Sequence, residues 1–276
     1  MLDVLMDTLL DIIKLFPFLF FAFLVIELIE HKFSEKSKNF ISSSGKLGPV
    51  IGGLLGAIPQ CGFSVVATNL YITRIITLGT LISIYLSTSD EMLPILLTSN
   101  IPITKVLLIV SIKVVIGIMA GFIIDFSFRK NKKKDFHICE EDDCDCEHSL
   151  IKSVIIHTLK TTIFIALITL LLNTLFYYGG EEFISKIFLS NPLIAPFISS
   201  LIGLIPNCGS SIVITELYIN SVINLGTLIG GLLTGSGVAI LVLFKSNKDI
   251  KENLLILSLV YTIGVISGII INILSM

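Results

Sequence analysis

Two similar stretches of the chain contain the side chains best suited to bind a ligand. In each, a proline, an amide residue, a cysteine and a glycine stand in order, and hydroxyl residues follow three and seven positions after the cysteine. This spacing places thiol and hydroxyl groups on one face of a helix. We expect the following residues to bind a substrate: Gln60, Cys61, Ser64, Thr68 and Asn69 in the first stretch, and Asn207, Cys208, Ser211, Thr215 and Glu216 in the second.

Three carboxylates lie in otherwise apolar segments. Asp90 and Glu91 stand in "STSDEMLP", and Glu216 closes the second stretch. Thiolates favour soft or borderline metals, whereas carboxylates favour Mn²⁺ and Mg²⁺. A site for a divalent transition metal is therefore indicated, with the candidate ligands Cys61, Asp90, Glu91, Cys208 and Glu216.

Plainer interpretations stay open for the same residues. Serine and threonine side chains can satisfy nearby helix carbonyls, and a free cysteine packs well as a buried apolar residue. Asp90 and Glu91 could stand in a loop between two shorter elements. Lys113, in a later apolar segment, is a candidate ion-pair partner for them.

A further group of metal-binding residue types lies in the central stretch "KNKKKDFHICEEDDCDCEHS". It lacks the paired C-x2-C spacing of structural zinc modules. An acidic segment with sulfur ligands can gather cations loosely, and a solvated linker whose acids balance the adjacent lysines is the alternative. The candidate ligands here are His137, Cys139, Cys144, Cys146 and His148.

The composition indicates that the chain lies in a membrane. Hydrophobic residues make up 54% of the 276 positions and charged residues 14%, against about 45–50% and about 25% in soluble domains. Uncharged runs reach the roughly 20 residues that a spanning helix needs. The net charge of −2 gives no reason to expect nucleic-acid binding. We predict an all-α, multi-pass protein of the inner cell membrane.

The second stretch repeats the first at an offset of 147 residues. Over positions 56–89, 19 of 34 residues are identical to those 147 positions later, and the same offset pairs Gly121 with Gly268 without a gap. Shared apolar composition alone would not produce this identity. The predicted units are a first membrane repeat at 1–128, a charged cytoplasmic linker at 129–148 and a second, inverted repeat at 149–276.

We predict five membrane elements in each half, bounded by loop charges and by proline and glycine breaks. An odd number inserts the two halves with opposite polarity. The positive-inside rule agrees, because it puts the lysine-rich segments after position 31, after position 128 and around position 248 on one side. The predicted elements are 10–31, 47–59, 62–74, 76–99 and 103–126, then 155–178, 193–206, 209–221, 224–245 and 252–275.

The second and third elements of each half are too short to span the membrane. About 13 helical residues measure roughly 20 Å, against a hydrocarbon core of about 30 Å. We therefore predict two broken helical hairpins that enter from opposite faces and meet at their tips near mid-membrane. The fourth element is predicted to unwind in both copies. Interrupted segments at matching places in inverted repeats indicate a transporter binding site.

At these motifs the sequence resembles the family of ten-transmembrane heavy-metal exporters, which are also described as manganese transporters and are related to arsenic permeases. The resemblance rests on "GAIPQCGFS", "GLIPNCGSS" and "STSDEMLP", and on the charged loop between the halves. It implies metal export and singles out Cys61, Asp90, Glu91 and Cys208. The loop contains two histidines, where such exporters tend to be histidine-rich.

The favoured hypothesis is a secondary transporter that exports a divalent, Mn-like metal, which passes as substrate and not as a cofactor. No P-loop or dinucleotide motif is present, so an ion gradient or a partner would supply the energy. The alternatives are a permease for an arsenic species, another anion or an organic solute, and an intramembrane thiol oxidoreductase that uses Cys61 and Cys208. We expect the lipid bilayer and the metal as partners, no enzymatic activity and, as an open option, a homodimer.

Overall fold

A computed structural model describes residues 47–58, 61–89, 92–99, 101–127, 194–206 and 208–275, with isolated helical positions between 13 and 24 and between 154 and 170. Every secondary-structure element among these residues is a helix, so the all-helical prediction is confirmed for this part of the chain. The predicted elements 10–31 and 155–178 fall largely outside the described residues, and the linker 129–148 falls wholly outside them.

The first half contributes five helices to the described ranges. The predicted hairpin corresponds to Gly48–Gly56 (α3) and Cys61–Ile72 (α4). The fourth predicted element corresponds to Leu78–Ser87 (α5) and Met92–Thr98 (α6), and the fifth to Ile103–Ser127 (α7). Pro49 fits the first turn of α3 because the backbone N–H it lacks would have no helical partner there.

The second half contributes the same five helices. Each begins 147 residues after its counterpart in the first half, so the duplication read from the sequence extends to the helix boundaries. These helices are Ala195–Gly203 (α11), Cys208–Ile219 (α12), Leu225–Thr234 (α13), Ala239–Ser246 (α14) and Ile250–Ser275 (α15).

The fourth element is two helices in each half, with the interruption where unwinding was predicted. Helix α5 has 10 residues and α6 has 7, about 15 Å and about 10 Å at 1.5 Å per residue. Neither is long enough to cross a membrane alone. Both pack on α7, so together they form one interrupted path along it.

Glycines allow three helices of each half to pack closely. In the first half α5 contacts both α3 and α7, and in the second half α13 contacts both α11 and α15. A Cβ on Gly79 would lie 2.1 Å from the Gly121 carbonyl oxygen, and one on Gly226 would lie 2.4 Å from the Gly268 carbonyl oxygen. Small residues at such crossings let helix backbones approach within a bilayer.

Shorter helices of each half pack against the other half. Helix α4 of the first half packs on α14 of the second, and α12 of the second half packs on α6 of the first. One buried apolar cluster accordingly contains Val65 with Ala239, and another contains Leu96 with Ile214. After each interruption in the fourth element, the chain therefore packs against a short helix of the other half, α12 or α4.

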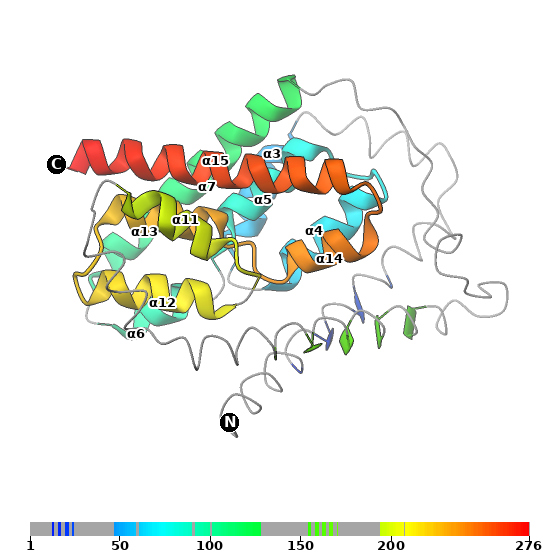
Figure 1. Cartoon of the computed structure of the whole chain (residues 1–276), viewed down its shortest axis with the longest axis horizontal. Helices are drawn as coiled ribbons and strands as arrows, with labels where there is room; N and C mark the ends of the chain where they lie inside the picture. Colours follow the sequence, from blue (N-terminus) through cyan, green and yellow to red (C-terminus); the bar gives the residue numbers. More distant parts are fainter. Residues whose placement is uncertain are drawn as a thin grey trace, which may run out of the picture.

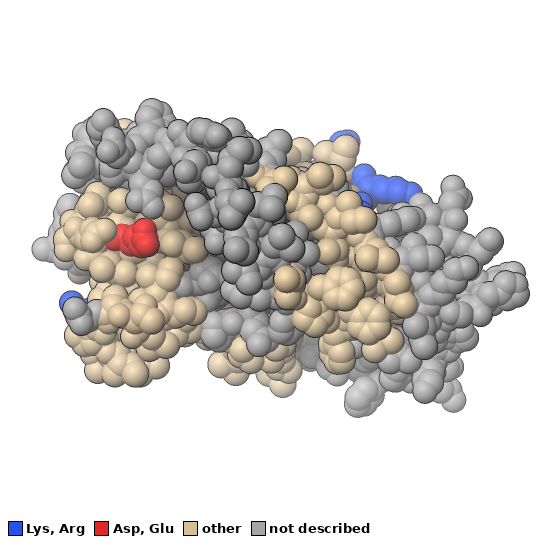
Figure 2. Space-filling model, turned by 90° about the horizontal axis from the view of Figure 1, so that it is seen from below, with Lys and Arg blue, Asp and Glu red and all other residues tan. Residues whose placement is uncertain are grey.

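Three stretches of the described residues are apolar and long enough to cross a membrane: Ile103–Ser127, Leu225–Ser246 and Ile250–Leu274. The middle one is 89% buried inside the protein, whereas the outer two are 33% and 28% buried, so α7 and α15 present apolar side chains outward. These two helices run in opposite directions along the long axis (Figure 1). On the face in Figure 2, the coloured charges lie toward the two ends of that axis.

Candidate functional site

In each half, the end of the first short helix lies beside the interruption in the fourth element. Helix α3 ends at Gly56, where a Cβ would lie 2.1 Å from the Ser87 hydroxyl at the end of α5. Helix α11 ends at Gly203, where a Cβ would lie 2.3 Å from the Thr234 hydroxyl at the end of α13. In each half, a contact that only glycine permits thus brings the end of the first short helix next to the interruption in the fourth element.

The polar face predicted on α4 is buried. Ser64, Thr68 and Asn69 are each at most 2% exposed. Thr68 Oγ1 donates to the Ser64 carbonyl at 2.7 Å, so its 2.6 Å contact with Tyr85 is a hydrogen bond donated by the Tyr85 hydroxyl. Asn69 Nδ2 has no hydrogen-bond partner among the described residues. Such a buried donor costs about 1–3 kcal/mol unless a ligand, a water or another residue accepts from it.

The equivalent face of α12 is similar for its threonine but differs at one position. Thr215 is fully buried and donates to the Ser211 carbonyl at 2.6 Å. Glu216 stands at the repeat position of Asn69 and is partly buried, as is Ser211. The interpretation that hydroxyl groups satisfy helix carbonyls therefore applies to both threonines. On this predicted polar face, Asn69 and Glu216 are the pair that differs in chemistry.

The interruption after α5 is lined by buried hydroxyls and one buried cation. Residues 87–89 are all serine or threonine, and each is at most 4% exposed. Lys113 of α7 is 1% exposed, and its Nζ donates to the Thr88 carbonyl oxygen. Because Thr88 is the C-cap of α5, Lys113 satisfies a carbonyl near a helix end.

The interruption in the second half lacks this charge. Val260 occupies the repeat position of Lys113. Gly237, with a φ of 56°, and Val238 replace the two adjacent carboxylates of the first half. One interruption is therefore charged and the other is neutral.

Several predicted ligands lie outside the described residues. Helices α4 and α12 begin at Cys61 and Cys208, but nothing is described of these two side chains, nor of the predicted meeting of the hairpin tips. Within the described ranges, no three His, Cys, Asp or Glu side chains are grouped so that they could hold a metal ion. The predicted ligands outside these ranges are Gln60, Asp90, Glu91, Asn207, His137, Cys139, Cys144, Cys146 and His148.

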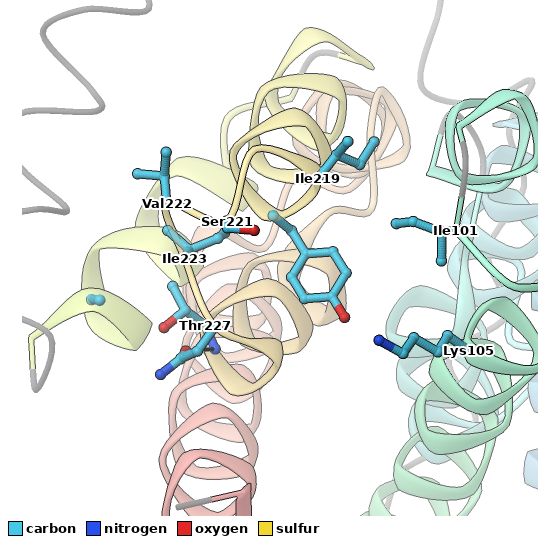
Figure 3. Close-up of a pocket in the computed structure, with 10 residues that line it drawn as sticks. Ile101, Lys105, Ile219, Ser221, Val222, Ile223 and Thr227 are labelled. Carbon is cyan, nitrogen blue, oxygen red and sulfur yellow. Dashed lines mark hydrogen bonds between the residues drawn. The ribbon is translucent and has the colours of Figure 1, made fainter.

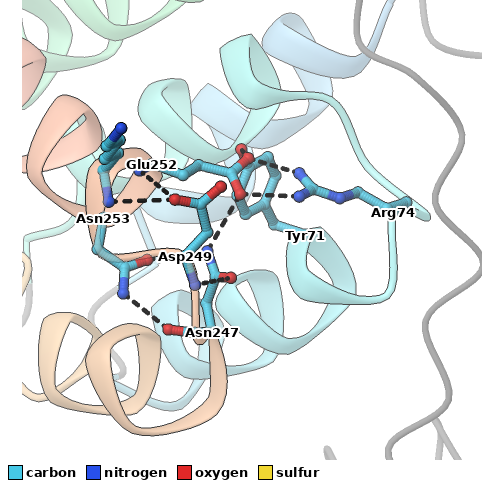
Figure 4. A network of polar contacts seen from close by, with 7 residues as sticks. Tyr71, Arg74, Asn247, Asp249, Glu252 and Asn253 are labelled. Atoms are coloured by element: carbon cyan, nitrogen blue, oxygen red, sulfur yellow. Dashed lines mark hydrogen bonds and ion pairs between the residues drawn. The ribbon is translucent and has the colours of Figure 1, made fainter.

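A polar cluster at the end of α4 joins the two halves (Figure 4). The Arg74 guanidinium binds both carboxylate oxygens of Glu252, at 2.7 and 2.8 Å. The Tyr71 hydroxyl donates to the same carboxylate, and Asn247 Nδ2 donates to it at 3.2 Å. Asn247 also donates to Asn253 Oδ1 at 2.8 Å. We call these five residues the Arg74 cluster.

The charge on Arg74 is held firmly. Its hydrogen bonds with Glu252 raise the pKa of the guanidinium above its usual value. The guanidinium carbon also lies 5.0 Å from the centre of the Tyr71 ring, in a cation–π arrangement. Bidentate pairing of arginine with a carboxylate is among the strongest hydrogen-bonded contacts in proteins.

Helices α4 and α12 end in the same turn. Arg74 and Ser221 occupy equivalent positions with φ values of 59° and 58°. In each copy the next residue donates its N–H to a carbonyl five positions earlier, at 2.8 and 2.9 Å, which is the Schellman pattern of helix termination. Because neither residue is glycine, each left-handed conformation costs about 1–2 kcal/mol. The two copies share a backbone and differ in side chains.

At the place equivalent to the Arg74 cluster, an open pocket lies between the second half and α7 of the first (Figure 3). It measures about 440 Å³ and lies between the start of α7 and the turn from α12 to α13. Lys105 stands at the repeat position of Glu252 and extends from α7 toward that turn, where Ser221 replaces Arg74. Tyr218, Ile219 and Ser221 line the opposite wall. We call this the Lys105 pocket.

The repeat itself carries a sequence signal for these residues. Comparison of the two copies shows departures from the repeat at the carboxylates Asp90, Glu91 and Glu216. The same comparison also pairs Arg74 with Ser221 and Glu252 with Lys105. Charged residues that interrupt an otherwise well-kept repeat mark both the Arg74 cluster and the Lys105 pocket.

Repeated, interrupted helices between outward-facing apolar helices define the chain as an α-helical membrane protein. A family model with the description "Putative, 10TM heavy-metal exporter" matches residues 1–178 and 145–276, which together cover the chain. The chain belongs to this family, as its hairpin motifs predicted, and the family is one of exporters rather than of enzymes. No curated protein and no solved structure matches the chain.

Proposed function

We propose that the chain is a secondary transporter that moves a divalent, Mn-like transition metal out of the cytoplasm. The observation that carries this proposal is the meeting of two interruptions within each half, at Gly56 with Ser87 and at Gly203 with Thr234. Unsatisfied backbone groups in hydrocarbon cost several kcal/mol each. Irregular backbone is tolerated at that depth where it is buried in protein or lines a cavity, and interrupted helices commonly form transporter sites.

The proposed ligands are the thiols at the start of each returning helix and the carboxylates that depart from the repeat. Lys113 donates at Thr88, two positions before Asp90 in the chain. One ammonium against the two carboxylates that follow Thr88 in the chain, Asp90 and Glu91, would leave a net negative charge, which favours a divalent cation. Carboxylate oxygens suit Mn²⁺, and thiolates extend the range to softer metals. The full proposed set is Cys61, Asp90, Glu91, Cys208 and Glu216.

We further propose that the two halves are inverted relative to each other in the cell membrane. Three features support this arrangement. Helices α7 and α15 run in opposite directions along the long axis, and α4 packs on α14 as α12 packs on α6. Arg74 and Glu252, which the loop charges assign to the cytoplasmic face, are in direct contact. Alternating exposure would then come from rocking one half against the other.

A second candidate function is a permease for an oxyanion, such as an arsenic species. It is favoured by the buried ammonium of Lys113 and by the side-chain amide nitrogen of Asn69, which has no acceptor among the described residues. Both groups donate hydrogen bonds and would suit an anion better than a metal ion. The two candidates differ in which buried charge the substrate needs.

The proposal is tested with purified full-length protein in liposomes loaded with Mn²⁺, Zn²⁺, Co²⁺ or Cd²⁺, with and without a proton gradient. We expect Asp90→Asn and Glu216→Gln each to slow metal efflux at least tenfold. Glu181→Gln, which changes a carboxylate outside the proposed ligand set, is the matched control and should leave efflux unchanged. Wild-type efflux rates in both site variants would rule out these carboxylates.

The oxyanion candidate predicts a different pattern in the same liposomes. Arsenite or arsenate flux should then fall at least tenfold in Lys113→Met and persist in Asp90→Asn. Metal efflux in the wild type, with no oxyanion flux, would exclude the second candidate.

A further inference from the structure

We infer that the Arg74 cluster is a gate in its closed state and that the Lys105 pocket is the equivalent gate in its open state. The inference rests on the proposed transporter function and adds to it the groups that close the path at each end.

The two places are equivalent in backbone and in position. Each lies where a returning hairpin helix ends in a Schellman turn with a left-handed residue, Arg74 or Ser221. Each also contains a tyrosine three positions before that residue and faces the first turn of a long helix, α15 or α7. A difference between them therefore reflects side chains and packing, not a different local fold.

Both the exposure of the side chains and the helix packing indicate that the Arg74 cluster is closed and the Lys105 pocket is open. Tyr71 is 1% exposed and Ile72 is 4% exposed, whereas their counterparts Tyr218 and Ile219 are partly exposed and line the pocket. Helix α4 also packs more extensively on α14 than α12 does on α6. The first place is closed by contact, and the second leaves about 440 Å³ open.

The groups at each place come from opposite halves of the chain. Arg74 belongs to the first half and Glu252 to the second, while Lys105 belongs to the first and Ser221 to the second. In Figure 1 the start of α15 and the start of α7 lie toward opposite ends of the long axis. A rotation of one half against the other would therefore widen one place as it narrowed the other.

The chemistry of the Arg74 cluster suits a contact that must break and reform. The Glu252 carboxylate accepts hydrogen bonds from Arg74, Tyr71 and Asn247, so the closed state is directional and specific. All of these groups are polar, and water can satisfy them when the halves separate. An apolar seal of similar size would instead expose hydrocarbon surface in the open state.

Two repeat-equivalent reporters make the inference measurable. Ile72→Cys places a thiol behind the Arg74 cluster, and Ile219→Cys places one in the Lys105 pocket. Full-length protein in nanodiscs is treated with a water-soluble maleimide, and the modification rate at each engineered position is read by peptide mass spectrometry, so the native cysteines do not interfere. We expect Ile219→Cys to react at least tenfold faster than Ile72→Cys.

Exchanging the charged pairs between the two places then tests what closes them. Arg74→Ser with Glu252→Lys copies the pocket onto the closed end and should raise the rate at Ile72→Cys at least tenfold. Ser221→Arg with Lys105→Glu copies the ion pair onto the open end and should lower the rate at Ile219→Cys by a similar factor. The single change Ser221→Arg is the matched control, since it adds bulk without a carboxylate partner.

Reporter rates that do not respond to either exchange would overturn the gate assignment. Size-exclusion profiles of each variant identify misfolded protein, and Lys105→Glu alone, which leaves the closed end intact, provides a second test of the pocket. The maleimide readout needs no metal. If the reporter rates change as expected but no metal efflux is seen, the gate assignment stands and the proposed substrate is rejected. If metal efflux is normal but the reporter rates do not change, the substrate stands and the gate assignment is rejected.

Discussion

The Arg74 cluster and the Lys105 pocket occupy equivalent places in the two halves, yet one is a filled contact and the other is a cavity. Their backbones agree closely, since both helices end in the same turn with φ values of 59° and 58°. The difference lies in four side chains: an arginine and a glutamate on one side, a serine and a lysine on the other. In this fold the duplicated backbone defines where the halves can meet, and the side chains decide whether they do.

The strongest test of this comparison concerns a place where the halves agree. Gly79→Val and Gly226→Val each put a side chain within 2.4 Å of a backbone carbonyl oxygen, so we expect each to destabilise the protein by at least about 3 kcal/mol. Retention of monomeric protein after heating in detergent measures this loss. Gly235→Ala is the control, because its nearest neighbour would be 3.6 Å away. Tolerance of valine in only one half would show that the two packings differ.

A smaller effect is expected where the halves differ. Glu252→Gln removes the carboxylate that pairs with Arg74, so the thermal midpoint should fall. The expected loss in the free energy of unfolding is about 2 kcal/mol. Lys105→Gln changes the matching position in the pocket and should stay within about 0.5 kcal/mol of wild type. Equal midpoints for the two variants would contradict the assignment of a closed contact to one end.

The smallest effect sharpens the comparison at a residue that both halves share. Tyr71→Phe removes a hydrogen bond to Glu252 and should cost about 1 kcal/mol. Tyr218→Phe removes a hydroxyl from the wall of an open pocket and should change stability by less than about 0.5 kcal/mol. The thermal midpoints of the two variants are measured side by side. Equal midpoints would contradict the difference between the two places.

Much of the helix pattern was predictable because local chemistry determines it. Proline and glycine at 59–62 and 206–209 predicted a break between two short helices in each half. The bounds of α3, α4, α11 and α12 agree with those of the predicted elements to within three residues. The interruption of the fourth element followed from two adjacent carboxylates in one copy and glycines in the other. The prediction treated it as one unwound element, whereas it ends one helix and begins another.

The contacts between the halves were not predictable from the same pattern. An exact offset says that two segments fold alike, but it does not say which helix of one half covers the hairpin of the other. Arg74 and Glu252 are separated by 178 positions, so their contact depends on how the two halves pack together. At the candidate site, the helical spacing predicted that Thr68, Thr215 and Asn69 share a polar face. The contact of Lys113 with the Thr88 carbonyl depends on how α5 packs on α7 and could not be predicted from spacing.

The exchange of short helices between the halves also has a consequence for how the protein is made. Helix α4 is covered by α14, which is encoded about 170 residues later. At a synthesis rate of about 5–20 residues per second, the first hairpin would wait roughly 10–30 s for its cover. During that interval the polar face of α4 must be kept away from lipid by another protein. Early insertion of this chain should therefore depend on the translocation machinery or on lipid-bound chaperones. A protein in which each half covers its own short helices should depend on them less.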